Sequence, residues 1–216
     1  MSRQLVIFDW DGTLMDSTRL IASCLQCACR DLGLAVPEFT DAKYVIGLGL
    51  AETVRYVAPS LNEERSARLV ERYRHHFLAR EHEAALYTGV DAMLGDLHAR
   101  GVRMAVATGK ARRGLERALD ASGLRPWFET TRCADEGFAK PHPDMLNVIL
   151  ECTGVDPRDA LMVGDTIHDL DLAANAGVDA VAVTYGAHDE ALLATRRSLA
   201  VLSSVPELHR WLTTSA

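Results

Sequence analysis

Short apolar runs alternate with amphipathic segments along most of the chain. The first run, Leu5–Phe8, is four consecutive apolar residues, which is typical of a strand buried on both faces of a parallel sheet. Further strands are expected at 102–107, 130–132, 160–163, 180–183 and 199–202. Helical spacing is found between and after them, at 91–100, 112–122, 144–152, 169–176 and 205–212. Strands that alternate with helices predict an α/β fold with a doubly wound parallel sheet.

A different pattern interrupts this alternation after the first strand. Helical spacing covers 17–32, where Asp16 or Ser17 is placed to cap the helix and Gly33 to end it. It continues through 41–46, 50–57 and 62–83, and no convincing strand is found between residue 16 and about residue 86. We therefore expect a core formed by residues 1–15 and 88–216, with a small helical cap domain, 16–87, inserted over the mouth of the first strand.

The first strand leads directly into acidic residues. Asp9 and Asp11 have no basic neighbour in the sequence, and an unpaired carboxylate is costly to bury. We therefore expect both at the carboxyl end of the strand, where open α/β sheets bind their ligands. Gly12 and Thr13 follow with a flexible backbone and a hydroxyl, so their N–H groups could approach an anion.

The sequence Asp-x-Asp-Gly-Thr at 9–13 closely resembles the first motif of the haloacid dehalogenase-like (HAD) phosphohydrolases. Three more motifs of that family follow in order: Thr108 after an apolar run, Lys140 in Lys-Pro-His-Pro, and Gly-Asp-Thr-Ile-His-Asp at 164–169. The resemblance covers nearly the whole chain. It implies a Rossmann-like core with a helical cap.

If the fold gathers Asp9, Asp11, Asp165 and Asp169, four negative groups face the single cation of Lys140. A like-charge pair at ~4 Å repels by about 4 kcal/mol at an effective dielectric near 20, so the cluster would also repel a phosphate. A divalent cation removes this conflict, and oxygen ligands with room for water and phosphate suit Mg²⁺. Asp169 could instead orient Lys140 or a metal-bound water from outside the ligand set.

Each step of phosphoryl transfer then has a candidate residue. Asp9 is the candidate nucleophile, because a carboxylate can attack phosphorus to give an aspartyl-phosphate. Asp11 would protonate the leaving alcohol and then activate water. Thr108 offers a hydroxyl to the phosphoryl oxygens, and Lys140 offers a positive charge. The resemblance implies the same roles, with Mg²⁺ held by Asp9, the main-chain carbonyl of Asp11, and Asp165.

Neighbouring positions refine this prediction. An acid at Asp11 is typical of the family's phosphatases and phosphomutases, whereas its dehalogenases and phosphonatases typically lack one. Many relatives have Asn after the motif threonine, where this chain has Gly109, so a side-chain contact is lost there. Gly109 and Lys110 are candidate phosphate-binding residues together with Gly12 and Thr13. Arg112 and Arg113 either read a second anionic group or form a solvated basic turn.

The cap is expected to set specificity, because it can close over the site and exclude water. The sequence Gly-Leu-Gly at 47–49 is either a mobile substrate loop or a plain turn between helices. Lys43 and Arg55 could meet a substrate carboxylate, although each also fits an ordinary helix surface.

Net charge, apolar runs and cysteine content limit the binding partners and the cellular location that we expect. The formal net charge of -7 disfavours nucleic acid and acidic membrane surfaces. No apolar run is long enough to cross a bilayer and no signal-peptide pattern precedes the first strand, so we expect a cytoplasmic protein. Five cysteines in such a chain predict free thiols, and the pair Cys24 and Cys27 is expected to pack in a helix rather than bind zinc.

The motifs together predict a Mg²⁺-dependent phosphatase that acts on a small phosphorylated metabolite, as a monomer or homodimer. The cap and the Lys-Pro-His-Pro motif look most like phosphoglycolate phosphatase-type members, so 2-phosphoglycolate is the leading substrate. A sugar-phosphate phosphatase, a β-phosphoglucomutase-like mutase and a phosphometabolite-binding regulator without turnover are the alternatives.

Overall fold

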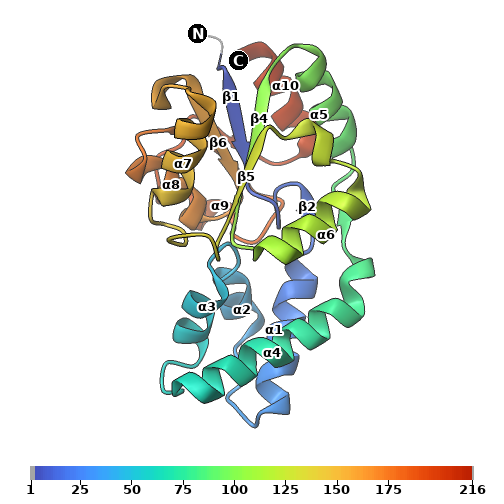
Figure 1. The fold of residues 1–216 in the computed structure, drawn as a ribbon, viewed down its shortest axis with the longest axis vertical. Helices are drawn as coiled ribbons and strands as arrows, with labels where there is room; N and C mark the ends of the chain where they lie inside the picture. The colour runs from blue at the N-terminus through green and yellow to red at the C-terminus, as the bar shows by residue number, and fades with distance from the viewer. Residues whose placement is uncertain (1–2, 216) are drawn as a thin grey trace.

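A computed structural model describes residues 3–215 of the chain, in a core and a helical cap (Figure 1). Six parallel strands form the core sheet in the order β5-β4-β1-β6-β7-β8. Their bounds are β1 Leu5–Phe8, β4 Arg103–Thr108, β5 Thr130–Cys133, β6 Ala160–Gly164, β7 Asp179–Val183 and β8 Val201–Leu202. The helices of the core are α5 Val90–Ala99, α6 Arg112–Ser122, α7 Asp144–Thr153, α8 Ile167–Asn175, α9 Glu190–Leu193 and α10 Val205–Ser215, with 3-10 turns at Arg125–Trp127 and Pro157–Asp159. The predicted parallel α/β sheet is confirmed.

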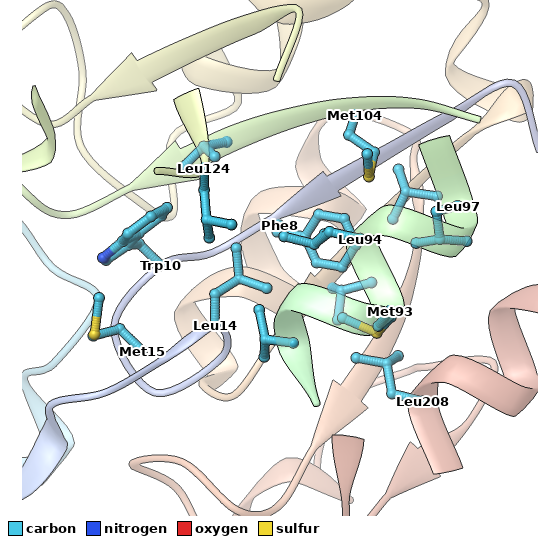
Figure 2. Close-up of a cluster of buried hydrophobic side chains, with 14 of the residues drawn as sticks. Phe8, Trp10, Leu14, Met15, Met93, Leu94, Leu97, Met104, Leu124 and Leu208 are labelled. Carbon is cyan, nitrogen blue, oxygen red and sulfur yellow. The ribbon is translucent and has the colours of Figure 1, made fainter. Parts of the chain in front are cut away.

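Strand β1 lies inside the sheet, between β4 and β6, and both of its faces are covered. Val6 and Phe8 pack into one apolar cluster with α5 and α10, while Leu5 and Ile7 pack into a second cluster with α7 and α8. This alternation follows from the two-residue period of a strand. Figure 2 shows Phe8 in the first cluster, beside side chains of α5. β1 pairs with β4 on one edge and with β6 on the other, so the carboxyl ends of these three strands lie together.

The cap helices lie at the end of the molecule away from the chain termini (Figure 1). They are α1 Thr18–Asp31, α2 Phe39–Tyr44, α3 Leu50–Val57 and α4 Glu63–Arg80, followed by a 3-10 turn at Glu81–Glu83. The cap has an apolar cluster of its own, with Leu25 and Leu69 among its buried members. No helix within residues 3–215 is long and apolar enough to cross a membrane.

Three local features differ from the expectation. Met15–Asp16 (β2) and Ala85–Leu86 (β3) form a two-stranded antiparallel ladder where the chain enters and leaves the cap. The short helix α9 was also not expected. Strands of two residues and a helix of four are too short to produce a recognisable period. Finally, Ser17 occupies the N-cap position of α1, but its hydroxyl donates to Asp11 instead of capping the helix.

Candidate active site

The carboxyl ends of the three central strands bring the motif residues together. Asp9 directly follows β1, Thr108 is the last residue of β4, and Asp165 directly follows β6. Lys140 reaches this edge from the loop before α7, and Asp169 from the first turn of α8. All five side chains are almost fully buried. The predicted gathering of the four motifs at one edge of the sheet is thus seen in the structure.

Lys140 lies between two carboxylates. Its Nζ donates to Asp9 Oδ1 at 2.7 Å and to Asp169 Oδ1 at 2.6 Å. Burial opposes the charge, but Asp169 and Asp9 outweigh it and hold the pKa of Lys140 above its ordinary value. Lys140 therefore stays a cation in contact with the candidate nucleophile.

Asp169 is fixed by the start of its own helix. Its backbone N–H donates to Thr166 Oγ1, and its Oδ2 accepts from the Thr166 backbone N–H and hydroxyl, which together form a capping box. Because the box holds Oδ2, Oδ1 is aimed at Lys140. This supports the expectation that Asp169 orients the lysine, and it also places Asp169 within the acidic cluster.

The acidic cluster has the chemistry of a cation site. Side-chain oxygens of Asp9, Asp165 and Asp169 lie within 4.8 Å of one another. Oδ2 of Asp9 is buried without a hydrogen-bond partner among the described residues. Burial and the charges of the two neighbouring aspartates raise the pKa of Asp9 well above its ordinary value, although Lys140 acts to lower it. A divalent cation at this edge would satisfy the orphaned oxygen and offset the repulsion, so the residues present fit Mg²⁺.

Asp165 is held by the turn that follows β1 and by the loop that follows β7. Its Oδ1 accepts from Thr13 Oγ1 at 2.8 Å and its Oδ2 from the Ala187 backbone N–H at 2.7 Å. Burial raises the pKa of Asp165 to about 7, and the charge of Asp169 adds to the rise. Gly12 has φ +91°, and a Cβ there would lie 2.2 Å from Asp165 Oδ2, so only glycine fits this turn.

The same turn uses the hydrogen-bond donors of Gly12 and Thr13 within the protein. Their N–H groups donate to the backbone carbonyls of Met15 and Trp10, and the hydroxyl of Thr13 donates to Asp165. None of these donors points to an open anion site. Gly12 and Thr13 position Asp165 in this structure, and their role in binding phosphate stays a prediction.

Asp11 is held away from the acidic cluster. Its Oδ1 accepts from Ser17 Oγ at 2.6 Å and from Lys110 Nζ at 2.9 Å, and its side chain is not among the three that converge. The ammonium of Lys110 also lies 4.8 Å from the ring centre of Phe77 in α4, within the range of a cation–π contact. Lys110 thus joins the cap to Asp11. Sequence reasoning missed Ser17 as a partner of Asp11, because a serine at a helix start already has an ordinary explanation.

Gly109 is explained by the cap loop. A Cβ at this position would lie 2.5 Å from the carbonyl oxygen of Gly47 and 2.7 Å from that of Leu48. The cap backbone therefore occupies the space that any side chain at this position would need. The hydroxyl of Thr108 accepts from the Lys110 N–H, which leaves its own proton free to donate to a phosphoryl oxygen.

We expect Gly109→Ala to lower the melting temperature and kcat/KM, because the added methyl group must displace the backbone of the cap loop. Gly114→Ala is the matched control: a Cβ there meets nothing within 4 Å, and in the helix α6 alanine is favoured over glycine by about 1 kcal/mol. Thermal unfolding should move in opposite directions for the two variants. A melting temperature for Gly109→Ala equal to or above that of the parent would show that the cap loop does not sit on this residue.

A chamber of about 340 Å³ lies between cap and core and contains the motif edge. Asp9, Asp11, Thr108, Gly109 and Lys110 line it from the core, and Gly47 and Leu48 line it from the cap. Gly47 and Leu48 of the loop at 47–49 therefore face the site, and a mobile, substrate-binding role of the loop stays a prediction.

Three basic residues that were candidates for binding an anionic group of the substrate do not line the chamber. Lys43 and Arg55 do not line the chamber: Lys43 Nζ donates to the Gly186 carbonyl and Arg55 pairs with Glu52. Arg112 is held by Glu136 at 2.7 Å and by Thr131, so it is not available to a ligand. Among Arg55, Arg112 and Arg113, the one that lines the chamber is Arg113.

A contact between cap and core was not foreseen from the sequence. The Tyr44 carbonyl at the end of α2 lies 2.8 Å from His168 Nε2 and 3.0 Å from His188 Nε2. The Tyr44 ring stacks on His188 and meets His168 edge to face. Burial lowers the pKa of both histidines, which favours neutral rings. Residues this far apart in sequence give no local signal of their contact.

Comparisons with known proteins agree with this geometry. Residues 6–183 match the family model described as haloacid dehalogenase-like hydrolase. The chain is 35% identical over 191 residues to the probable phosphatase IndB of Dickeya dadantii, covering 86% of this chain and 83% of that protein. It is 32% identical over 191 residues to a phosphoglycolate phosphatase of Caulobacter vibrioides, covering 86% of this chain and 81% of that protein.

A further relative is longer than this chain. The chain is 39% identical over 187 residues to a protein of Mycobacterium tuberculosis named tyrosine-protein kinase PtkA, covering 86% of this chain but 63% of that protein. Among solved structures, a hydrolase from Pseudomonas syringae superposes with a TM-score of 0.91 at 22% identity, covering 99% of both chains.

The chain belongs to the haloacid dehalogenase-like hydrolase family, as the sheet, the cap and the acidic edge indicate. Two of the relatives described above are named as phosphatases.

Proposed function

We propose that the protein is a Mg²⁺-dependent phosphatase that hydrolyses a small phosphomonoester through an aspartyl-phosphate on Asp9. The observation that carries this proposal is the Asp9 carboxylate itself. One of its oxygens is bonded to Lys140 at 2.7 Å, while the other is buried without a partner and the residue lines the chamber. A carboxylate that is fixed in this way and open to a ligand is suited to nucleophilic attack.

The side chains on the chamber divide the reaction into two displacements. Asp9 attacks phosphorus, the bond from phosphorus to the ester oxygen breaks, and Asp11 gives its proton to the departing alcohol. Asp11 then takes a proton from water, which attacks the phosphorus of the aspartyl-phosphate and releases inorganic phosphate. Lys140 neutralises charge beside Asp9 throughout, and the hydroxyl of Thr108 donates to a phosphoryl oxygen.

The residues that would hold Mg²⁺ are Asp9, Asp165 and the main-chain carbonyl of Asp11. The ion would supply positive charge to the phosphoryl oxygens. Thr13 and Ala187 hold Asp165 in the orientation that this requires. Asp169 contributes by aiming Lys140 at Asp9.

The ion should stabilise the fold more strongly as the pH rises. Without metal, the folded chain keeps a proton on Asp165 up to about pH 7, whereas the unfolded chain loses it near pH 4. Between these values the folded state binds more protons than the unfolded state, so metal-free stability from this group falls as the pH rises. Bound Mg²⁺ keeps Asp165 ionised and removes the loss, by on the order of a few kcal/mol at neutral pH.

Urea unfolding in Mg²⁺ and in EDTA at pH 5 and pH 7.5 measures this effect. The gain on adding Mg²⁺ is compared at each pH, so that titrations elsewhere in the protein cancel. We expect a larger gain at pH 7.5. An equal gain at both values, or none, would contradict the placement of the ion beside Asp165.

The assay that tests the proposed function follows inorganic phosphate with p-nitrophenyl phosphate and a panel of phosphorylated metabolites, with and without EDTA. The relatives named phosphoglycolate phosphatase make 2-phosphoglycolate the reference substrate of the panel. Steady, metal-dependent release of phosphate supports a hydrolase. Interconversion of hexose phosphates without net release would identify a mutase, and absence of turnover at high enzyme concentration would favour a binding protein.

A further inference from the structure

The cap side of the chamber is strongly apolar. The cap residues that line it come from α1, α3, α4 and the loop before α3. Besides Gly47, Thr53 and Arg74, they are apolar or aromatic: Ile21, Leu25, Val45, Ile46, Leu48, Leu50, Tyr73, Phe77 and Leu78. Leu25, Val45, Ile46 and Phe77 are buried, so these residues belong to the packed cap, whereas Leu78 is 51% exposed. The space next to the reacting edge is therefore bounded by hydrocarbon and aromatic groups.

The chamber lacks an unpaired, buried cation among its described lining residues that could pair with a substrate carboxylate close to phosphorus. Its lining contains four cations. Three of them, Arg74, Arg113 and Arg117, are exposed to solvent, and Arg117 pairs with Glu81. The fourth, Lys110, is half-buried and already paired with Asp11 at 2.9 Å. A substrate carboxylate beside the ester oxygen would be desolvated against apolar walls, which is costly.

Two aromatic rings extend the apolar wall. Tyr73 and Phe77 stack with ring centres 6.0 Å apart on successive turns of α4, and both line the chamber. The ammonium of Lys110 lies over the face of the Phe77 ring and also pairs with Asp11. Lys110 therefore links this wall to Asp11. An aryl or alkyl group attached to the phosphate would lie against these rings.

We infer that the chamber binds the leaving group as an apolar body of several carbon atoms, an alkyl or aryl alcohol, in preference to the short carboxylated alcohol of 2-phosphoglycolate. This inference rests on the proposed phosphatase function for its role in turnover, but the binding preference is a property of the chamber alone. Transfer of each methylene from water to such a wall favours binding by about fourfold. The relatives' reference substrate is thus expected to be a poor one here.

A series of n-alkyl phosphates from methyl to hexyl, with phenyl phosphate and 2-phosphoglycolate, tests the inference in turnover. We expect kcat/KM to rise about threefold to fourfold per methylene until the chamber is filled, and hexyl phosphate to exceed 2-phosphoglycolate by at least about a hundredfold. A flat series, or 2-phosphoglycolate as the best substrate, would overturn the inference while leaving the phosphatase function intact.

Binding of n-alkylphosphonates, measured by calorimetry in Mg²⁺, gives a second readout that needs no turnover. We expect the dissociation constant to fall with chain length by the same factor per methylene. If no phosphate ester is hydrolysed but this trend is found, the proposed function fails and the inference about the chamber stands. If hydrolysis is found and the affinities do not change with chain length, the inference fails alone.

Isosteric substitutions locate the effect. Val45→Thr places a hydroxyl in the wall of the chamber, whereas Val36→Thr makes the same change on the cap at a residue that is 40% exposed and outside the chamber. We expect Val45→Thr to reduce the ratio of hexylphosphonate to methylphosphonate affinity by about threefold or more, and Val36→Thr to leave it unchanged. Ile21→Thr, at a less buried wall position, also introduces a hydroxyl, although it removes a methyl group as well, and it is used if Val45→Thr unfolds. Unchanged ratios in both wall variants would overturn the inference.

Discussion

Asp9→Asn is expected to abolish turnover, with kcat lower by about 10⁴-fold or more. The amide is nearly isosteric and can occupy the same position beside Lys140, but its oxygen is not a nucleophile toward phosphorus. Removal of a nucleophile from a concerted set of groups has effects on this scale. The folded state should persist, because Lys140 retains Asp169 at 2.6 Å and the variant removes a carboxylate that burial disfavours.

The measurement is steady-state phosphate release in Mg²⁺, with thermal unfolding to confirm the fold. Cys24→Ala is the control, since Cys24 is a buried free thiol of the cap that does not line the chamber. We expect it to retain turnover. Residual activity above about one per cent in Asp9→Asn, or a comparable loss in Cys24→Ala, would contradict the role given to Asp9.

Lys140→Ala is expected to reduce both activity and stability. The substitution leaves Asp9 and Asp169 buried without their shared cation, and breaking a buried ion pair by removing one partner costs about 3–5 kcal/mol. The same change removes the charge that faces the phosphoryl group during transfer, so kcat should fall by about a hundredfold to a thousandfold. Urea unfolding and phosphate release measure the two effects on the same sample.

Lys43→Ala provides the comparison, because Lys43 makes a single hydrogen bond to a carbonyl and does not line the chamber. Its loss should cost about 1 kcal/mol and leave kcat within a few-fold of the parent. A free energy of unfolding for Lys140→Ala that is close to that of Lys43→Ala would show that the lysine is not needed to hold the acidic cluster.

The core and the position of the site could be predicted from the sequence because each has a local signal. Runs such as Leu5–Phe8 are short and apolar at every position, which is typical of a strand covered on both faces. The acids come directly after such strands, and the carboxyl ends of paired parallel strands lie together. The placement of Asp9, Thr108 and Asp165 at one edge follows from these two facts.

The remaining features depend on which partner each group contacts in the folded chain, and the residue types alone do not show this. Gly109 is a glycine because the backbone of the cap loop, more than fifty residues earlier, fills the space at its Cα. Gly12 and Thr13 matched an anion-binding turn by composition, yet their donors are used by Met15, Trp10 and Asp165. Composition could show which groups were available, but it could not show which partners had already taken them.

Trapping the phosphorylated enzyme tests the central claim most directly. The enzyme is mixed with substrate and Mg²⁺, quenched in acid within the first turnovers, digested and analysed by mass spectrometry for an acyl phosphate. The mechanism predicts one added phosphoryl group on the peptide that contains Asp9, absent in Asp9→Asn. Phosphate released at full rate with no acyl phosphate at Asp9, or an acyl phosphate on another residue, would contradict it.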